Sequence, residues 1–287
     1  MFGSAYSLLA LGFSLVFGIM KKINLAYGSS LLLAGACSVW VQEMAGFSVT
    51  GLFITIISAS ILINFYVERI CFAPHRGQSG AIASIIASFA IWMQLDEMAF
   101  HLLPDRTHSF SSLNLDILQF GEILVRGDQL IHLAIAFTVM ILLYFLIMKT
   151  NFGLLLRAAS ENSETASILG TRVALLGTAT FMLAGFLGGV ASFLILSSDS
   201  QITPLFGLWC TFKGLVAMML GGVGSLLGAV IGGLLLGFIE AHVTFYLGAE
   251  FRDIITFGIL FAVLVIKPGG IFGGNEIQLY NDLERRL

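Results

Sequence analysis

The feature that most constrains the fold is a succession of apolar segments, each about as long as a bilayer core is thick. A transmembrane helix needs about 20 predominantly apolar residues. Such segments cover residues 2–20, 23–41, 51–67, 80–95, 130–148, 173–196, 226–247 and 253–266, and a shorter one covers residues 205–220. We therefore predict that residues 1–287 form a single all-α polytopic membrane domain of about eight or nine transmembrane helices, the short one included.

Composition supports this class and excludes several others. Only 11% of the residues are charged, whereas a soluble domain carries about 25%. The net charge of -3 gives no reason to expect nucleic acid as a partner. No Walker A or dinucleotide-binding motif occurs, and the histidines and cysteines lack metal-ligand spacing. We expect neither enzymatic activity nor a cofactor in this chain, so energy must come from another protein or from an ion gradient.

The distribution of basic residues predicts the orientation in the membrane. If the loop 149–172 is cytoplasmic, three basic residues lie outside, and these are Arg106, Arg126 and Arg252. The cytoplasmic side then contains ten basic residues, which are Lys21, Lys22, Arg69, Arg76, Lys149, Arg157, Arg172, Lys267, Arg285 and Arg286. Cytoplasmic loops carry an excess of lysine and arginine. This places the N-terminus outside and the C-terminus inside.

The polar loop 149–172 carries the signals of a short helix over residues 157–170. Asn162 can cap its N-terminus, Glu164 puts a carboxylate near the positive end of the helix dipole, and Gly170 can adopt the left-handed conformation that ends a helix. So short a helix is marginal in water on its own. We therefore expect a partner to hold it.

The largest loop on the opposite side, residues 96–129, has the pattern of a hairpin. Residues 112–117 alternate polar and apolar side chains, which indicates a strand, and residues 120–126 could supply the return strand around Gly121. Such a hairpin either forms a simple lid over the helix ends or offers a docking surface to an external protein.

Two stretches suggest interrupted helices. Residues 221–225 contain too much glycine for a helix interior, and residues 21–30, where the second apolar segment begins, form a weaker counterpart. Broken helices often line the substrate site of transporters. The candidate pathway residues are Asn24, Tyr27, Gly28, Ser29, Gly222, Gly224 and Ser225. For their polar side chains the alternative role is hydrogen bonding between helices.

Lys213 and Glu240 place charges inside apolar segments. Ionisable groups at membrane depth are costly and suggest function. For Lys213 the alternative is that its long stem snorkels to the interface. For Glu240 the alternative is a hydrogen-bonded structural carboxylate between helices.

Four segments together resemble the permease subunits of branched-chain amino acid ABC importers of the LivH/LivM type, and LivH more closely. They are residues 5–18 running into 23–28, residues 67–74, residues 157–170, and residues 220–225 with 267–273. The resemblance extends over nearly the whole chain. It implies a subunit of the bacterial inner membrane, without ATPase activity of its own, that moves a small polar solute from periplasm to cytoplasm by alternating access.

The resemblance also implies partners. These are a second permease subunit, either LivM-like or a second copy, two cytoplasmic ATPase subunits that bind ATP and Mg, and a periplasmic solute-binding protein. Residues 157–170 are similar to the coupling helix that docks on the ATPase. The residues implied in coupling are Arg157, Glu161, Asn162, Glu164, Ala166, Leu169 and Gly170.

The solute stays open at this point. The family usually has histidine and glutamate where this chain has Tyr27 and Ser29, so the solute could be a branched-chain amino acid, a related amino acid or an amide. From the residues alone, the alternative function is a stand-alone channel or ion-coupled carrier for a small polar solute such as urea.

Overall fold

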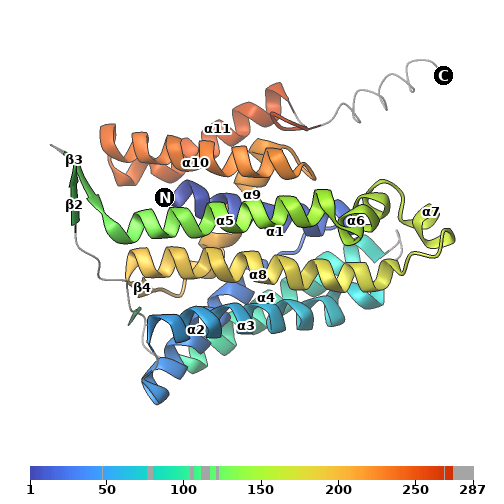
Figure 1. The fold of residues 1–287 in the computed structure, drawn as a ribbon, viewed down its shortest axis with the longest axis horizontal. Helices are drawn as coiled ribbons and strands as arrows, with labels where there is room; N and C mark the ends of the chain where they lie inside the picture. The colour runs from blue at the N-terminus through green and yellow to red at the C-terminus, as the bar shows by residue number, and fades with distance from the viewer. Residues whose placement is uncertain are drawn as a thin grey trace.

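Long helices lying side by side make up the fold, as a computed structural model of the chain shows (Figure 1). The structure describes residues 1–46, 48–75, 80–103, 107–110, 117–120, 123–267 and 269–273. The long helices are α1 (Phe2–Met20), α2 (Tyr27–Ala45), α3 (Val49–Val67), α4 (Ala81–Leu102), α5 (Gly127–Lys149), α8 (Val173–Asp199), α9 (Phe206–Gly221), α10 (Leu226–Tyr246) and α11 (Arg252–Ile266). Each corresponds to one predicted apolar segment, although α2 begins later and α4 ends later than predicted.

Within the described residues, six helices are long and apolar enough to cross a membrane. They are α1, α3 with its extension to His75, α4, α5, α8 and α10. At 16 and 15 residues, α9 and α11 are shorter than the about 20 residues that a crossing needs. The all-α polytopic class is thus confirmed, whereas a count of eight or nine crossings stays a prediction.

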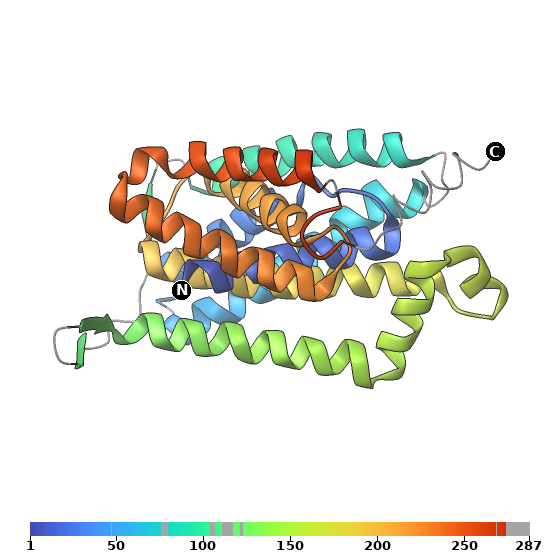
Figure 2. The same cartoon turned by 90° about the horizontal axis from the view of Figure 1, so that it is seen from above.

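The helices α1 and α8 lie at the centre of the bundle. Of their most apolar windows, 83% and 78% is buried, against 22% in α3 and in α4. The central α1 packs on α8, α9 and α10, and α3 packs on α8. Figure 2 shows α5 along one side of this core and α4 and α11 along the other. The apolar outer faces of these peripheral helices suit contact with lipid.

Glycines bring α10 close to its neighbours. A Cβ added at Gly233 would lie 2.3 Å from the Ser7 backbone nitrogen of α1, and one added at Gly232 would lie 2.2 Å from the Ala217 carbonyl oxygen of α9. Small residues at such contacts are typical of packed transmembrane helices. Much of the glycine in this part of the sequence therefore serves helix packing.

Short elements mark the two ends of the bundle (Figure 1). At the hairpin end, β2 (Ile117–Phe120) pairs with β3 (Ile123–Arg126) in antiparallel fashion. At the opposite, α7 end, α6 (Asn151–Glu161) and α7 (Ser163–Ile168) project from the bundle. A second antiparallel pair joins β1 (His108–Ser109) to β4 (Gln201–Ile202), which the sequence did not indicate.

The structure confirms the hairpin and corrects its position. Its first strand is Ile117–Phe120 rather than residues 112–117, and residues 111–116 and the turn with Gly121 lie outside the described residues. The loop is also shorter than the predicted range 96–129, because α4 continues to Leu102 and α5 already begins at Gly127.

The described basic residues segregate between the two ends. Lys149 and Arg172 flank the α6–α7 segment, whereas Arg126 and Arg252 lie where α5 and α11 begin, at the hairpin end. Arg76, Arg106, Arg285 and Arg286 lie outside the described residues. The two ends therefore differ in charge as predicted, and which end faces the cytoplasm stays a prediction.

Candidate functional site

α7 is a capped surface helix. The Asn162 side-chain oxygen accepts hydrogen bonds from the backbone N–H groups of Glu164 at 3.1 Å and Thr165 at 2.9 Å. Just beyond the helix, Gly170 adopts a φ of 87°, a left-handed conformation that costs glycine little. Ile168 and Leu169 are 81% and 80% exposed. Two adjacent exposed apolar side chains at the tip of a projecting helix are typical of a contact surface.

The single helix predicted over residues 157–170 is wrong, because the chain forms two helices there. Arg157 and Glu161 belong to α6, and α7 begins only at Ser163. Asn162 between them is extended, with φ -150° and ψ 102°, since its side chain bonds to the next turn and so competes with helix continuation. Of the implied coupling residues Ala166 is buried, and the exposed ones are Arg157, Glu161, Asn162, Glu164, Leu169 and Gly170.

A small apolar cluster attaches α6 and α7 to the start of α8. It contains the buried residues Ala159, Ala166 and Leu176, with Phe152 and Val173 packed against them. This cluster is separate from the main core. α7 therefore packs on α6 and on the first turns of α8, and α6 itself packs on α5 and α1.

The next turn of α8 connects to α3. Thr178 Oγ1 donates a hydrogen bond of 3.1 Å to Glu68 Oε2. Glu68 is fully buried in η1 (Glu68–Phe72), a π-helical turn that continues α3 and is followed by η2 (Ala73–His75). Phe72 of the same turn packs on Phe181 of α8, with ring centroids 4.8 Å apart. The segment 67–74 thus contacts α8 close to the turns of α8 on which α7 packs.

α2 begins inside the bundle, about halfway along α1 and α8. The Tyr27 hydroxyl donates to the Ala184 carbonyl at 2.8 Å, and its ring packs on Phe13 with centroids 4.7 Å apart. A Cβ added at Gly28 would lie 2.0 Å from the Gly207 carbonyl oxygen of α9. The N-terminal end of α2, which carries the positive end of the helix dipole, is therefore enclosed by α1, α8 and α9. The Tyr27 side chain thus makes the hydrogen bond between helices, from α2 to α8, that was the alternative to a role in the pathway.

Asn24 and Ser29 are buried beside this helix start. The Asn24 side-chain oxygen accepts from the Ala26 N–H at 3.1 Å, and its Nδ2 has no hydrogen-bond partner among the described residues. Ser29 lies beside Asp96 on α4, and Asp96 Oδ2 accepts from Trp92 Nε1 at 2.7 Å. The sequence reading missed Asp96 as an intramembrane carboxylate because it ended this apolar segment at residue 95.

The glycine-rich segment 221–225 lies at the α7 end and is a turn between α9 and α10. Gly222 and Gly224 have φ values of 119° and 80°, and Ser225 Oγ caps α10 by accepting from Gly228 N–H at 3.1 Å. The structure does not bring these residues together with the start of α2. The seven candidate pathway residues therefore occupy two separate places.

Carbonyl groups at the end of α9, next to this turn, bind the segment after α11. Ile271 N–H donates to the Leu220 carbonyl and Phe272 N–H to the Gly221 carbonyl, each at 2.9 Å. A Cβ added at Gly222 would lie 2.5 Å from the Gly273 nitrogen. The two parts of the fourth segment that carries the family resemblance, residues 220–225 and 267–273, are thus in direct contact.

Lys213 and Glu240, 27 positions apart, form a buried ion pair. Lys213 Nζ also donates to Asp253 Oδ1 at 2.7 Å. Glu240 accepts from the Tyr6 hydroxyl at 2.8 Å, and Arg252 Nε lies 3.7 Å from its Oε2. We call Lys213, Glu240, Arg252 and Asp253 the ionic cluster.

The ionic cluster gives both charged side chains partners, and a functional role for them stays a prediction. The Lys213 ammonium group binds one buried carboxylate, on Glu240, and one largely exposed carboxylate, on Asp253. Glu240 is the hydrogen-bonded carboxylate between helices. The sequence reading missed Arg252 and Asp253 as its partners, although opposite charges at membrane depth tend to pair, which was a usable signal.

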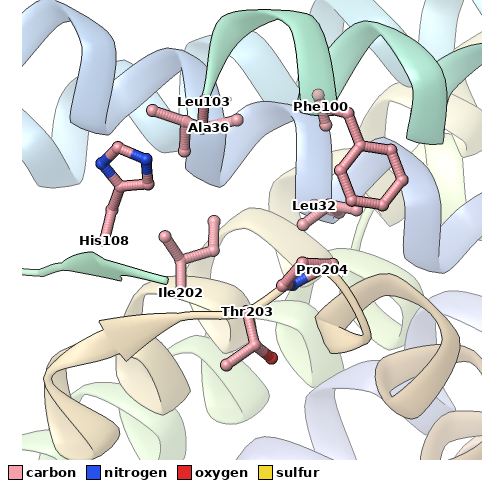
Figure 3. Close-up of a pocket in the computed structure, with 9 residues that line it drawn as sticks. Leu32, Ala36, Phe100, Leu103, His108, Ile202, Thr203 and Pro204 are labelled. Atoms are coloured by element: carbon pink, nitrogen blue, oxygen red, sulfur yellow. The ribbon is translucent and has the colours of Figure 1, made fainter. Parts of the chain in front are cut away.

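Cavities of different size open at the hairpin end. Figure 3 shows one between α2, α4 and the β1–β4 pair, lined among others by Leu32, Phe100 and His108. Its volume of about 20 Å³ holds no more than about one water molecule. A second cavity of about 220 Å³ is lined by Phe2, Asp199, Gln201, Thr203, Leu205, Phe206, Trp209 and Arg252. Of these two, only the second has room for a solute.

The known proteins that this chain resembles are transport permeases. Residues 1–264 match the family described as branched-chain amino acid transport system / permease component. The chain is 30% identical, over 96% of its length and 94% of theirs, to the branched-chain amino acid permease proteins BraD of Pseudomonas aeruginosa and LivH of Salmonella typhimurium. It is 26% identical to the galactofuranose transporter permease YtfT of Escherichia coli, over 77% of this chain and 62% of YtfT.

Proposed function

Because this chain belongs to the branched-chain amino acid transport permease family, we propose that it is the membrane-spanning subunit of an ATP-driven importer. In this proposal it passes a branched-chain or related amino acid from periplasm to cytoplasm by alternating between outward- and inward-facing states. The chain is a multi-pass transport permease, so ATP and Mg would be bound by separate ATPase subunits at its α7 end. A second permease subunit and a solute-binding protein at the hairpin end would complete the assembly.

The observation that supports the proposal is that α7 has an exposed apolar end and packs on α8. Its Ile168 and Leu169 side chains are exposed at the tip of the molecule, and its Ala166 is packed on α8. A partner that grips the exposed side of α7 would therefore move the start of α8. In a stand-alone channel or carrier for a solute such as urea, this projecting helix would be incidental.

The experiment is co-purification of the ATPase subunits with full-length permease carrying both Ile168→Ser and Leu169→Ser. Full burial of a large aliphatic side chain contributes about 2 kcal/mol, which is about thirtyfold in affinity. We expect the double variant to lose the ATPases while inserting normally in the membrane. Leu247→Ser is the matched control, since Leu247 is 56% exposed at the hairpin end. Retained ATPases in the double variant, or uptake of solute in vesicles without ATPases, would contradict the proposal.

A further inference from the structure

An apolar groove separates α5 from α10 in the half of the bundle nearer to α7. Its volume is about 270 Å³, and it is lined by Leu11 of α1, by three residues of α10 and by seven residues of α5 between Phe137 and Met148. None of these lining residues is charged. Phe137, Ile141 and Leu227 are exposed, so the groove opens toward the surroundings of the bundle. We call it the α5–α10 groove.

The α5–α10 groove has the depth of one membrane leaflet. At 1.5 Å per residue, Phe137 and Met148 lie about 16 Å apart along α5. The hydrocarbon core of a bilayer is about 30 Å thick, so one leaflet contributes about half of that thickness. Because α5 ends at Lys149, at the α7 end of the bundle, the groove lies in the leaflet on the α7 side.

The lining of the groove favours a hydrocarbon chain over water. A water molecule needs polar partners in a cavity, and the groove offers mainly apolar side chains. An unfilled groove would deprive those side chains of van der Waals contacts. The two occupants that a membrane supplies are an acyl chain of a lipid and a helix of another protein.

Positive charge gathers at the α7 end of the groove. Lys149 directly follows the lining residue Met148, and Arg157 Nη1 of α6 lies 3.5 Å from Met148 Sδ. Both basic side chains are exposed, and neither forms an ion pair with a described residue. α10 begins at the lining residue Leu226, so the positive end of its helix dipole lies at the same end. This arrangement complements a phosphate group placed at the head of an acyl chain.

The same charges disfavour a second copy of the chain in the groove. Two copies in one membrane are usually related by a two-fold axis, which brings the same surface of both copies together. An interface centred on this groove would therefore bring the Lys149 and Arg157 side chains of both copies to one place. Like charges at such an interface repel each other.

We propose that the α5–α10 groove binds an anionic phospholipid of the α7-side leaflet. One acyl chain lies along α5 between Phe137 and Met148, and the phosphate group binds Lys149 and Arg157. Basic residues at the membrane surface attract anionic lipids, and the apolar groove adds a fixed place for the chain. This site is independent of the transported solute.

The test uses the full chain in nanodiscs of phosphatidylcholine doped with a phosphatidylglycerol that carries a diazirine on one acyl chain. After irradiation, mass spectrometry of the peptides locates the cross-links. We expect labels on α5 between Phe137 and Met148 and on α10 between Leu226 and Val230. A phosphatidylcholine with the same diazirine chain is the matched probe. Its yield on these residues should be at least fivefold lower, because each basic residue near the membrane surface favours an anionic headgroup about fivefold.

Three variants connect the label to the groove and to its charges. Lys149→Gln combined with Arg157→Gln should lower the phosphatidylglycerol yield to the phosphatidylcholine level. Arg69→Gln combined with Arg172→Gln removes two exposed basic residues of η1 and of the start of α8, at the same end of the bundle, and should leave the yield unchanged. Val230→Phe fills the groove without a change in charge, so it should lower the labelling by both probes.

Several results would overturn the proposal. They are equal labelling of the groove by the two probes, no label on the groove, or labelling that survives the combined change at Lys149 and Arg157. Disulfide-linked dimers of Ile141→Cys, absent in the wild type, would also overturn it, because a second copy would then occupy the groove.

Discussion

Replacing Glu240 by leucine should strongly destabilise the protein. Glu240 is 4% exposed, and its loss leaves the ammonium group of Lys213, itself 2% exposed, with Asp253 as its remaining carboxylate. Breaking a buried ion pair by removing one partner costs about 3–5 kcal/mol. The Asp253 side chain is 58% exposed, so it offsets only about 1 kcal/mol. We expect Glu240→Leu to lower the free energy of unfolding by about 3 kcal/mol.

The double variant Lys213→Met with Glu240→Leu removes both buried charges at once. Replacing a buried pair by apolar residues of similar size is often neutral, so the double variant should recover most of the lost stability. Asp253→Asn serves as the exposed control and should cost about 1 kcal/mol or less.

The assay is equilibrium unfolding in mixed detergent micelles, followed by far-UV circular dichroism. The wild type, Glu240→Leu, Asp253→Asn and the double variant are compared under one set of conditions. If Glu240→Leu costs no more than Asp253→Asn, or if the double variant is less stable than Glu240→Leu, then removing Glu240 does not leave a costly buried charge on Lys213.

Three further changes test local features. Asn162→Ala removes the cap of α7, so it should cost about 1 kcal/mol of helix stability and weaken ATPase co-purification, whereas an unchanged co-purification would show that the cap is dispensable. Gly222→Ala combines a φ of 119° with a Cβ 2.5 Å from the Gly273 nitrogen, and should lower the unfolding midpoint by the equivalent of about 1–3 kcal/mol. Gly12→Ala would place a Cβ 2.1 Å from the Tyr27 hydroxyl and should cost about 1–3 kcal/mol. Adding Tyr27→Phe should recover part of that loss in the same unfolding assay, and no recovery would refute the steric explanation.

Local signals were sufficient for much of the fold. Helices in a bilayer must satisfy their own backbone groups, so runs of apolar residues located the long helices, and alternation located the hairpin approximately. The cap at Asn162 and the stop at Gly170 were also readable, because both depend on neighbouring residues only.

Features that depend on packing could not be read in this way. The pairing of Lys213 with Glu240 needs the relative rotation of α9 and α10, which no local pattern contains. The start of α2 at Tyr27 depends on close contact with Gly12, Gly188 and Gly207 on three other helices. The turn at Gly222 was read as a helix break with free backbone groups, and only the fold shows that residues 271 and 272 bind them.

α8 is long enough to connect the α7 end of the bundle to the hairpin end. Its 27 residues form a rod of about 40 Å at 1.5 Å per residue, with Leu176 against α7 at one end and Asp199 at the other. If α8 tilted as a rigid rod, a displacement at Leu176 would be carried to Asp199 at the other end of the helix. Spin labels at positions 175 and 200, near the two ends of α8, should then both change position relative to the other helices between nucleotide states. Movement at position 175 alone would show that α8 bends and does not transmit the displacement from its α7 end to its hairpin end.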